Sequence, residues 1–582
     1  MEDIERAPSS HPSDLSVSSS TSDEEDESKT ESPLGKLDFA PLPELPKSSK
    51  EQQLAPLLWI CRKYGKGRDR VITRCFSHPY LNAPLFGPFT RYWFLLDINI
   101  MELLFFVTLF TIIMAEFRDE NWGKACRVTL ALLVLPVAKN NALYFLFGLP
   151  FERGIKYHRW LGYFFVVPVT LHALLEQDFF EWSMNLSGFI AWMVYCFILI
   201  TSFELLRRSC FELFFYCHFA FIIFCVFVAI HEYVPLLLLS LQETTKLNSD
   251  NSAGTLGAMI PGLLMYAVDV LFRLTRYFTS RSTRTLSITT LPNNMVRLEM
   301  KKKFNFNAGQ WVLVNIPSIS WHQWHPFSIS CAPQQPTMTL HIKDSGGWTH
   351  RLSELLKKQQ QQQEEEGDEE NKGNKQKQQP LRLKVDGPWG KTAISYSRYK
   401  TVAIFAAGAG VTPMISILKD IYARQFYLHQ YPAEASSASS SSSPSRASLK
   451  KCKVERVYFV WVVPSVETLE WFREELLHMW NHPLPNLQVK LRLFVTRPPA
   501  PSSLSDAAMS GLWKGLPYIG GRPNITKECE LMCEESQGAG IKKVGVMVCG
   551  PSFFDSEVRW NCVRHTTPFK MQFDFHHETF DF

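Results

Sequence analysis

The feature that most constrains this 582-residue chain is a series of apolar segments between residues 93 and 275. Six of them approach the roughly 20 residues that a helix needs to cross the hydrocarbon core of a bilayer. They lie at about 94–115, 126–148, 157–176, 185–206, 213–237 and 255–273. Because a backbone in lipid must satisfy its own hydrogen bonds, these segments predict an all-α bundle of six transmembrane helices.

Basic residues gather on alternate loops between these segments, and this asymmetry orients the bundle. Loops rich in Lys and Arg face the cytosol by the positive-inside rule. The basic loops are 68–91, 152–159, 207–208 and 273–284, whereas the loops 116–124, 176–181 and 232–250 are acidic or mixed. The sequence therefore predicts an integral, multi-pass protein in contact with membrane lipid, in the plasma membrane or an endomembrane, with both termini in the cytosol.

The whole chain predicts a multidomain fold with the membrane bundle at 90–276. Residues 1–50 are acidic and rich in Ser, so we expect a disordered tail there. Short alternating runs over 281–395 are typical of an antiparallel β-barrel, and strands that alternate with helical stretches over 399–582 predict an α/β domain with a parallel sheet. Three low-complexity inserts are expected to be solvated loops, at about 357–380, 433–450 and 498–510.

Charge and cysteine usage exclude several classes of protein. The net charge of +5 is too small to indicate nucleic-acid binding, and no run of Lys and Arg alternates with aromatic residues. The 13 cysteines are scattered, with no CxxC pair. We therefore expect reduced thiols rather than a disulfide framework or a zinc site.

Four histidines lie between residues 78 and 322, within or at the edge of two apolar segments. An ionisable side chain in lipid is costly without a partner, so each is a functional candidate. His158 and His172 are 14 residues apart, and His218 and His231 are 13 apart, about 20 Å along each helix. The third and fifth segments cross the membrane in the same direction, so His158 can meet His218 near the cytosol and His172 can meet His231 near the outside. Two stacked pairs of imidazoles suit two haems.

One detail of this spacing fits an ideal helix poorly. A 14-residue step returns close to the same helix face, but a 13-residue step lands about 140° away. The fifth helix must therefore tilt, wind differently or bulge. Two other interpretations remain open from spacing alone: four unrelated histidines that hydrogen-bond within a helix bundle, or a metal-ion channel, although no carboxylate ladder accompanies them.

The segments YHRWLGYFFVVPVTLH and ITSFELLRRSCFELFFYCHFAFIIFCVFVAIH resemble the haem helices of NADPH oxidases and ferric reductases. The resemblance continues in PGLLMYAVDVLFR and covers about residues 90 to 582. It implies that the four histidines hold two haem b groups in the membrane domain. It also implies that the barrel and the α/β domain bind FAD and NADPH.

The barrel region carries a series of motifs that could hold a flavin. The run HPFSIS at 325–330 offers a flat ring, hydroxyls and donors, while HIK and GGWT offer charge and backbone N–H groups to a diphosphate. Together with DGPWG at 386–390, they resemble the FAD domain of the ferredoxin-reductase type. The candidate FAD-binding residues are His325, Pro326, Phe327, Ser328, His341, Ile342, Lys343, Gly347 and Thr349.

Two motifs in the α/β region could bind a nicotinamide cofactor. A glycine-rich turn with Gly408, Gly410, Thr412 and Pro413 lies where an apolar strand meets a helix, and such a turn lets backbone approach a pyrophosphate. Cys549, Gly550 and Pro551 follow the last apolar strand. In similar proteins this cysteine lies beside the nicotinamide during hydride transfer, and a terminal aromatic residue, here Phe582, stacks on the flavin. Arg497 would favour the 2′-phosphate of NADPH, although a solvated loop arginine is an alternative.

The resemblance implies that electrons pass from cytosolic NADPH through FAD and both haems to an acceptor across the membrane. Two axial histidines leave the iron no open site, so we expect one-electron transfer to molecular oxygen, giving superoxide. Lys139, in PVAKN where the family usually has PV-x-R-N, is expected near the outer haem, where a basic group helps to hold oxygen. Glu176 stands where animal oxidases carry another histidine.

The acceptor has an alternative. GRPN at 521–524 and FHHETF near the end resemble oxidases, whereas VTR at 495–497 resembles ferric reductases. A ferric or cupric chelate reductase, with chelated ferric iron as acceptor, is therefore the second interpretation. An electron-inert membrane scaffold is a third, which the intact cofactor motifs disfavour. A regulatory subunit or a homo-oligomer is left open.

Overall fold

The computed structural model describes residues 107–108, 111, 122–139, 151–175, 182–242, 254–279, 282–367, 380–390, 396–430, 452–498, 510–566 and 571–577. The chain divides into two compact units, Met1–Glu44 and Leu45–Phe582, and every described residue belongs to the second. The predicted tail, most of the predicted first membrane helix, the insert at 433–450 and residues 499–509 of the insert at 498–510 lie outside the described residues.

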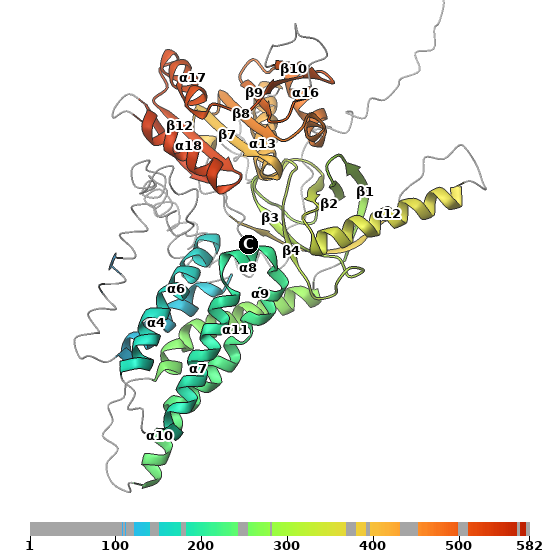
Figure 1. Cartoon of the computed structure of the whole chain (residues 1–582). Helices are drawn as coiled ribbons and strands as arrows, with labels where there is room; N and C mark the ends of the chain where they lie inside the picture. The colour runs from blue at the N-terminus through green and yellow to red at the C-terminus, as the bar shows by residue number, and fades with distance from the viewer. Residues whose placement is uncertain are drawn as a thin grey trace, which may run out of the picture. The chain divides into compact units, whose positions relative to one another are not determined.

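The helices of the membrane region follow five of the predicted apolar segments (Figure 1). A buried cluster of aromatic rings joins three of them, because the ring of Phe165 lies 5.0 Å from that of Tyr195 and 6.5 Å from that of Phe224. The elements are α4 (Trp122–Val134), η5 (Leu135–Val137), α6 (Phe151–Leu175), α7 (Trp182–Thr201), α8 (Glu204–Ser209), α9 (Phe211–His218), α10 (Phe221–Gln242) and α11 (Thr255–Thr279).

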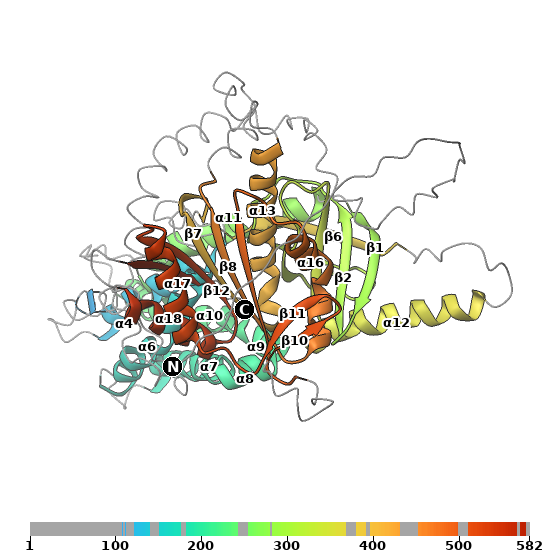
Figure 2. The same ribbon diagram turned by 90° about the horizontal axis from the view of Figure 1, so that it is seen from above.

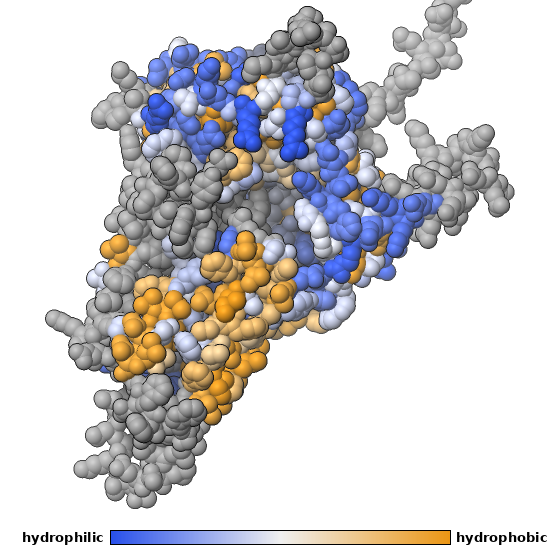
Figure 3. Space-filling model, viewed as in Figure 1, coloured by the Kyte–Doolittle hydropathy of each residue, from blue (hydrophilic) through white to orange (hydrophobic). Residues whose placement is uncertain are grey.

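Apolar side chains cover the outside of these helices. Figure 3 shows a wide apolar surface over this region, and soluble monomers rarely expose so large a patch. Two stretches of the described residues, Phe211–Tyr233 and Thr255–Thr275, are long and apolar enough to cross a membrane, and Leu186–Thr201 is a shorter apolar helix. The count of six transmembrane helices therefore stays a prediction. On α7 the exposed apolar residues are Leu186, Phe189, Met193, Phe197 and Ile200.

The fifth predicted segment is interrupted. α9 ends at His218, and α10 begins at Phe221 after a turn at Phe219 and Ala220. The N–H groups of Phe219, Ala220 and Ile222 donate to carbonyls three residues earlier, at 3.2, 3.0 and 3.0 Å. Such bonds rotate the chain by about 120° per residue instead of about 100°. The interruption therefore changes the winding in the direction that the 13-residue step requires.

The barrel region forms a six-stranded antiparallel sheet in the order β4-β3-β6-β1-β2-β5. A bridge between Ile329 and Leu340, with a bond of 3.0 Å from the Ser330 N–H to the Thr339 carbonyl, joins its two edges. Apolar residues of every strand except β4 belong to the buried core of this region. The strands are β1 (Thr283–Leu291), β2 (Met295–Lys301), β3 (Trp311–Asn315), β4 (His325–Ser328), β5 (Thr337–Lys343) and β6 (Arg382–Trp389).

One predicted loop in this region is partly wrong. α12 runs from Gly347 to Gly367, so the first part of the insert predicted at 357–380 is helical. Its Gln, Glu and Lys residues are all good helix formers, and the helix that starts at Gly347 continues through them. Residues 368–379 lie outside the described residues.

The α/β domain has a seven-stranded sheet in the order β10-β11-β9-β8-β7-β12-β13 (Figure 2). All neighbours are parallel except β10 and β11, which confirms the predicted parallel sheet in its main part. The strands are β7 (Thr401–Ala407), β8 (Arg456–Val463), β9 (Gln488–Val495), β10 (Ser510–Trp513), β11 (Leu516–Gly520), β12 (Lys543–Cys549) and β13 (Gln572–His577).

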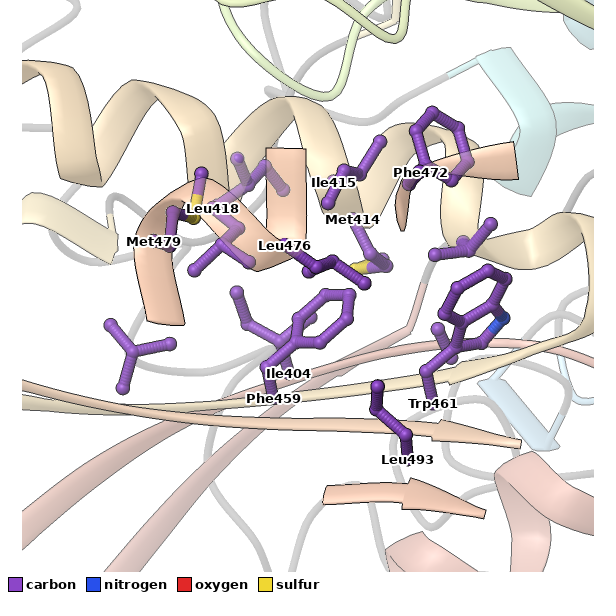
Figure 4. Close-up of a cluster of buried hydrophobic side chains, with 14 of the residues drawn as sticks. Ile404, Met414, Ile415, Leu418, Phe459, Trp461, Phe472, Leu476, Met479 and Leu493 are labelled. Atoms are coloured by element: carbon purple, nitrogen blue, oxygen red, sulfur yellow. The ribbon is translucent and has the colours of Figure 1, made fainter. Parts of the chain in front are cut away.

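Helices cover both faces of this sheet. α13 (Val411–Gln430) and α16 (Arg473–Asn481) pack on one face, where Figure 4 shows Ile415 and Leu476 above Phe459 and Trp461. α17 (Ile525–Gly538) and α18 (Ser552–His565) bury Met532 and others on the opposite face. Strands that are buried on both faces explain the continuous apolar runs of the sequence.

Candidate functional site

The four membrane histidines meet in the two pairs that their spacing predicts. The ring centroids of His158 and His218 lie 6.0 Å apart, which we call the first histidine pair. Those of His172 and His231 lie 6.2 Å apart, which we call the second histidine pair. Both pairs have their rings near perpendicular, at 71° and 73°. Two metal–nitrogen bonds of about 2 Å would fit between rings so spaced.

Hydrogen bonds orient the rings of the first pair. His158 Nδ1 lies 2.9 Å from the Leu133 carbonyl oxygen. Because a carbonyl can only accept a hydrogen bond, Nδ1 carries the hydrogen and Nε2 keeps its lone pair. His218 Nδ1 lies 3.3 Å from the Ser202 hydroxyl. A ligating imidazole is held in this way by a partner on its other nitrogen. No group of three or more His, Cys, Asp and Glu in the described residues could hold a bare metal ion.

A glycine gives the second pair its room. A Cβ added to Gly188 on α7 would lie 2.9 Å from two ring atoms of His231. Such a distance is too short for a real contact, so a side chain at this position would displace the ring. The absence of a side chain at Gly188 therefore fixes how close α7 and α10 approach at the second histidine pair.

Lys139 lies at the opposite end of the bundle from the expected position. α4 reaches the first histidine pair at Leu133, and the chain then runs on to Lys139, whose ammonium lies 5.7 Å from the ring centroid of Phe151. The Lys139 N–H donates to Asp269 at 3.3 Å, and Asp269 pairs with Arg273 at 3.1 Å. The expectation that Lys139 stands beside the outer haem is therefore wrong.

The basic residue at the second pair is Arg127, which the sequence reasoning missed. Its guanidinium lies 3.6 Å from the carboxylate of Glu232, the residue after His231. Glu232 also accepts hydrogen bonds of 2.6 and 2.8 Å from the Thr255 N–H at the start of α11. The sequence did hold one signal, since an arginine inside a predicted membrane segment marks a functional position.

The motif HPFSIS forms β4 and the residues that follow it. The ring of His325 stacks on Trp348 at 4.6 Å and 28°, and Phe327 lies 5.8 Å from the same indole. Burial lowers the pKa of His325 to about 4, so its imidazole is neutral at neutral pH. Phe327 is half-buried and Ser328 is buried. Pro326 lies between His325 and Phe327 on the same strand.

The GGWT motif forms a cradle at the start of α12. Gly346 and Gly347 have φ values of +97° and +53°, and an added Cβ at either would meet nothing within 4 Å. Thr349 closes the turn, since its hydroxyl donates to the Gly346 carbonyl at 2.8 Å. Lys343 is exposed just before this turn. A helix N-terminus with open glycines and a nearby ammonium suits a diphosphate.

Two of the expected diphosphate ligands do not face this cradle. His341 is 5% exposed, its Nδ1 lies 2.7 Å from the Ser330 hydroxyl, and its ring lies 4.3 Å from that of Phe472. Burial lowers the pKa of His341 to about 3. Ile342 belongs to the core of the barrel region. The side chains of His341 and Ile342 therefore face the protein interior and not the cradle, because both faces of β5 are buried, and their assignment to the diphosphate stays a prediction.

The two nicotinamide motifs meet at the point in the sheet where the strand order reverses. β7 leads to β8 on one side, while β12 lies on its other side, and ligands of such sheets bind at this switch point. Gly408 and Gly410 follow β7, and Cys549 ends β12. A Cβ added to Gly410 would lie 2.5 Å from the Cys549 carbonyl oxygen. The hydroxyl of Thr412 donates to the Ala409 carbonyl at 3.0 Å and closes the turn.

The motif CGP is packed as closely as the turn beside it. A Cβ on Gly550 would lie 2.9 Å from that of Ala407, the last residue of β7. Pro551 then caps α18, and Pro413 lies buried in the first turn of α13. The sequence-predicted residues of the nicotinamide site are therefore brought together around β7 and β12.

Arg497 is exposed at the same edge of the sheet and has a basic neighbour. β9 ends at Val495, whose register partner on β11 is Gly520, and the Gly521 N–H donates to the Val495 carbonyl at 2.7 Å. Arg497 and Arg522 each follow two residues after these ends, and both are exposed. Both residues therefore follow the carboxyl ends of neighbouring parallel strands, and guanidinium groups from the two positions would together suit a phosphate. The sequence offered Arg522 within GRPN, but only the register shows its neighbour. Phe582 and Glu176 lie outside the described residues.

Comparisons with known proteins divide the chain into three matched regions. Residues 123–229 match the ferric reductase like transmembrane component, 280–393 match an FAD-binding domain, and 399–563 match the ferric reductase NAD binding domain. The three matches are therefore to a membrane component, a flavin-binding domain and a nicotinamide-binding domain, in that order along the chain. The chain belongs to the family of NADPH oxidases and ferric reductases.

Relatives of both kinds are similar to this chain. A superoxide-generating NADPH oxidase heavy chain of Dictyostelium discoideum is 26% identical, over 69% of this chain and 54% of its own length. Probable ferric reduction oxidase 1 of Arabidopsis thaliana is 30% identical, over 52% and 40%. NADPH oxidase 1 of Mus musculus is 27% identical, over 68% and 66%. The chain spans about half the length of the curated relatives it matches.

The contact between Gly410 and Cys549 generates a first prediction. Gly410→Ala should lower the free energy of unfolding by about 1–3 kcal/mol, since its Cβ would overlap a backbone carbonyl, and should weaken binding of NADP⁺. Thermal unfolding and calorimetric titration of the purified full chain would measure both. Gly538→Ala is the control, because its Cβ would meet nothing within 4 Å. Equal behaviour of the two variants would contradict the packing argument.

Proposed function

We propose that the chain carries electrons from cytosolic NADPH through FAD and two haem b groups to molecular oxygen on the opposite face of the membrane, producing superoxide. The observation that carries this proposal is the geometry of the two histidine pairs. Their rings stand 6.0 and 6.2 Å apart, and 14 residues of one helix, about 20 Å, separate the pairs.

The pairs suit haem better than the other two interpretations of the histidines. Each pair offers two facing imidazoles, and this is the protein contribution that would hold one haem. Unrelated histidines that hydrogen-bond within a helix bundle would have no reason to face one another, whereas here all four rings meet in two pairs of nearly equal spacing. His158, His172, His218 and His231 would be the ligands.

The dehydrogenase residues would bind and orient the two soluble cofactors. FAD, when bound, supplies the step from a two-electron donor to one-electron acceptors. The cradle at Gly347 would hold its diphosphate through backbone N–H groups, with Lys343 as the counter-charge. Gly408 and Gly410 would admit the pyrophosphate of NADPH, and Cys549 would line the nicotinamide pocket. Arg497 and Arg522 would hold the 2′-phosphate.

The acceptor would approach at the second histidine pair. His172 and His231 would hold a haem there, and that haem would supply single electrons when bound. Arg127 is the basic group that this region offers, in place of Lys139. The second candidate is reduction of chelated ferric or cupric ions, which is favoured by the relatives named as ferric reduction oxidases. We leave a regulatory subunit or a second copy as partners to be tested.

The haem assignment predicts that a variant of either histidine in the second pair loses one of the two haems. His172→Ala and His231→Ala should each lower total haem, measured as the pyridine haemochrome, by about half, while NADPH still reduces the flavin. Gly188→Ala should also lower it, because its Cβ would displace His231. Gly162→Ala is the matched control, with its nearest contact at 3.8 Å. Full haem in both histidine variants would refute the assignment.

The two arginines predict the choice of nicotinamide. Arg497→Ala and Arg522→Ala should each raise the KM for NADPH on the order of 10-fold and leave that for NADH nearly unchanged, because NADH lacks the 2′-phosphate. Arg456→Ala is the control, since Arg456 starts β8 at the other end of the strands and bonds Gln488 and Glu535. Equal effects on the KM for both nucleotides would contradict the 2′-phosphate assignment and would favour the alternative that Arg497 is a solvated loop residue.

The choice of acceptor is tested in liposomes that contain the purified protein, FAD and NADPH. Oxygen reduction should be sensitive to superoxide dismutase, with the product on the face opposite the flavin. Chelated ferric iron is added in competition, under air and under nitrogen. Iron reduction that persists without oxygen and dominates in air would replace the oxidase by a ferric reductase. Arg127→Ala should lower acceptor turnover more than Lys139→Ala does, because Arg127 lies at the second pair.

A further inference from the structure

A stripe of buried polar residues runs along one face of α13. Ser416, Lys419 and Asp420 stand three and four residues apart, so they share a helix face. Ser416 and Asp420 are fully buried and Lys419 is 8% exposed. Charged residues are rarely buried without partners, so the partners of this stripe indicate what it does.

The partners belong to the loop that follows the flavin motif. The Ser416 hydroxyl donates to the Cys331 carbonyl at 2.7 Å, and the Lys419 ammonium donates to the Ser330 carbonyl at 3.3 Å. At Asp420, which is one turn after Ser416, the side-chain amide of Gln334 donates to the carboxylate at 2.6 Å. Three successive polar groups of one helix are thus bonded to residues 330–334, which continue directly from Phe327 and Ser328.

Further contacts hold in place both sides of the junction between α13 and residues 330–334. Lys419 is paired with Glu475 of α16 at 2.7 Å, so its charge stays balanced although it is buried. Asp420 also accepts from the Tyr396 hydroxyl and, at 2.7 Å, from Arg424. On the flavin side, the hydroxyl of Ser330 bonds the Thr339 carbonyl at 3.0 Å and His341 at 2.7 Å.

The two ends of the junction lead to the two cofactor sites. α13 begins at Val411, directly after the turn at Gly408 and Gly410, and Lys419 follows about 12 Å further along the helix. Ser330 lies two residues after Ser328, about 7 Å along an extended chain. The stripe therefore forms a hydrogen-bonded link between the helix that follows the nicotinamide turn and the loop that follows the flavin motif.

We propose that Ser416, Lys419 and Asp420 are positioning residues that fix the distance and angle between the nicotinamide and the flavin for hydride transfer. This inference rests on the proposed function. A hydride, two electrons and one proton, passes from NADPH to FAD and leaves NADP⁺, and its rate is sensitive to misplacement of about 1 Å. The stripe touches neither cofactor site directly, so its effect is on geometry rather than on affinity.

The test compares variants of the stripe in the full-length protein. Ser416→Ala removes one bond, and the double variant Lys419→Met, Glu475→Gln removes the buried ion pair without leaving either charge alone. Flavin reduction by NADPH in stopped flow should slow on the order of 10-fold in the double variant. The dissociation constant of NADP⁺ and the FAD content should change little. Lys419→Arg, which keeps the charge, should recover part of the rate.

A spectroscopic readout separates positioning from a merely structural role. A nicotinamide stacked on a flavin gives a long-wavelength charge-transfer absorbance, and titration with NADP⁺ should show this band weakened in the double variant at full NADP⁺ occupancy. Lys490→Met is the control, because Lys490 of β9 forms an ion pair of 2.5 Å with Glu535 of α17, away from both motifs. This control should keep both the rate and the band.

The outcomes distinguish this inference from the function beneath it. If the unmodified protein does not reduce its flavin with NADPH, the proposed function fails. If it does, and the double variant keeps both the rate and the charge-transfer band, the positioning role is overturned. A loss of rate that follows loss of FAD or of NADP⁺ affinity also overturns it, since the stripe would then act only on folding or binding.

Discussion

The cost of an imidazole in an apolar surrounding is the constraint on which the membrane region depends. Each of the four histidines must have a partner, and the two helices that carry them must therefore keep a register. The tight turn at Phe219 and the missing side chain at Gly188 both serve this register, one through winding and the other through space. The outer faces of the described helices carry exposed apolar side chains, such as Phe189, Met193 and Phe197 of α7, which can meet lipid.

The dehydrogenase solves a related problem with parallel strands. Side-by-side placement of β7 and β12 brings a glycine turn and a CGP turn into contact, although 138 residues lie between Gly410 and Cys549 in the sequence. Glycine is required at both turns because the neighbouring backbone and side chains leave no room for a Cβ. The junction of α13 with the barrel region extends this rigid geometry toward the flavin motif.

The sequence predicts those parts of the site that follow from periodicity. The pairing of His158 with His218 needs only helix length and direction, and the meeting of Gly410 with Cys549 needs only the rule for parallel sheets. It fails where a residue's surroundings come from elsewhere in the chain. His341 lies on a strand that is buried on both faces, so no alternation could show that it faces Phe472. Lys139 is expected from the sequence at the other end of the bundle, because its position along the membrane normal depends on where α4 begins. The sequence positions of Arg497 and Arg522 do not show that they follow neighbouring strands, which only the register of β9 and β11 reveals.

The pairing of Arg127 with Glu232 has a consequence for how molecules reach the second histidine pair. A lone arginine would project its field about 10 Å into solution at moderate ionic strength and would gather anions from a distance. With a carboxylate 3.6 Å away, the two charges form a dipole whose field falls off within the pair's own neighbourhood. This ion pair therefore adds little long-range steering of its own at this end of the bundle. A small neutral molecule such as oxygen loses nothing by that arrangement, whereas a charged chelate is no longer drawn toward the site.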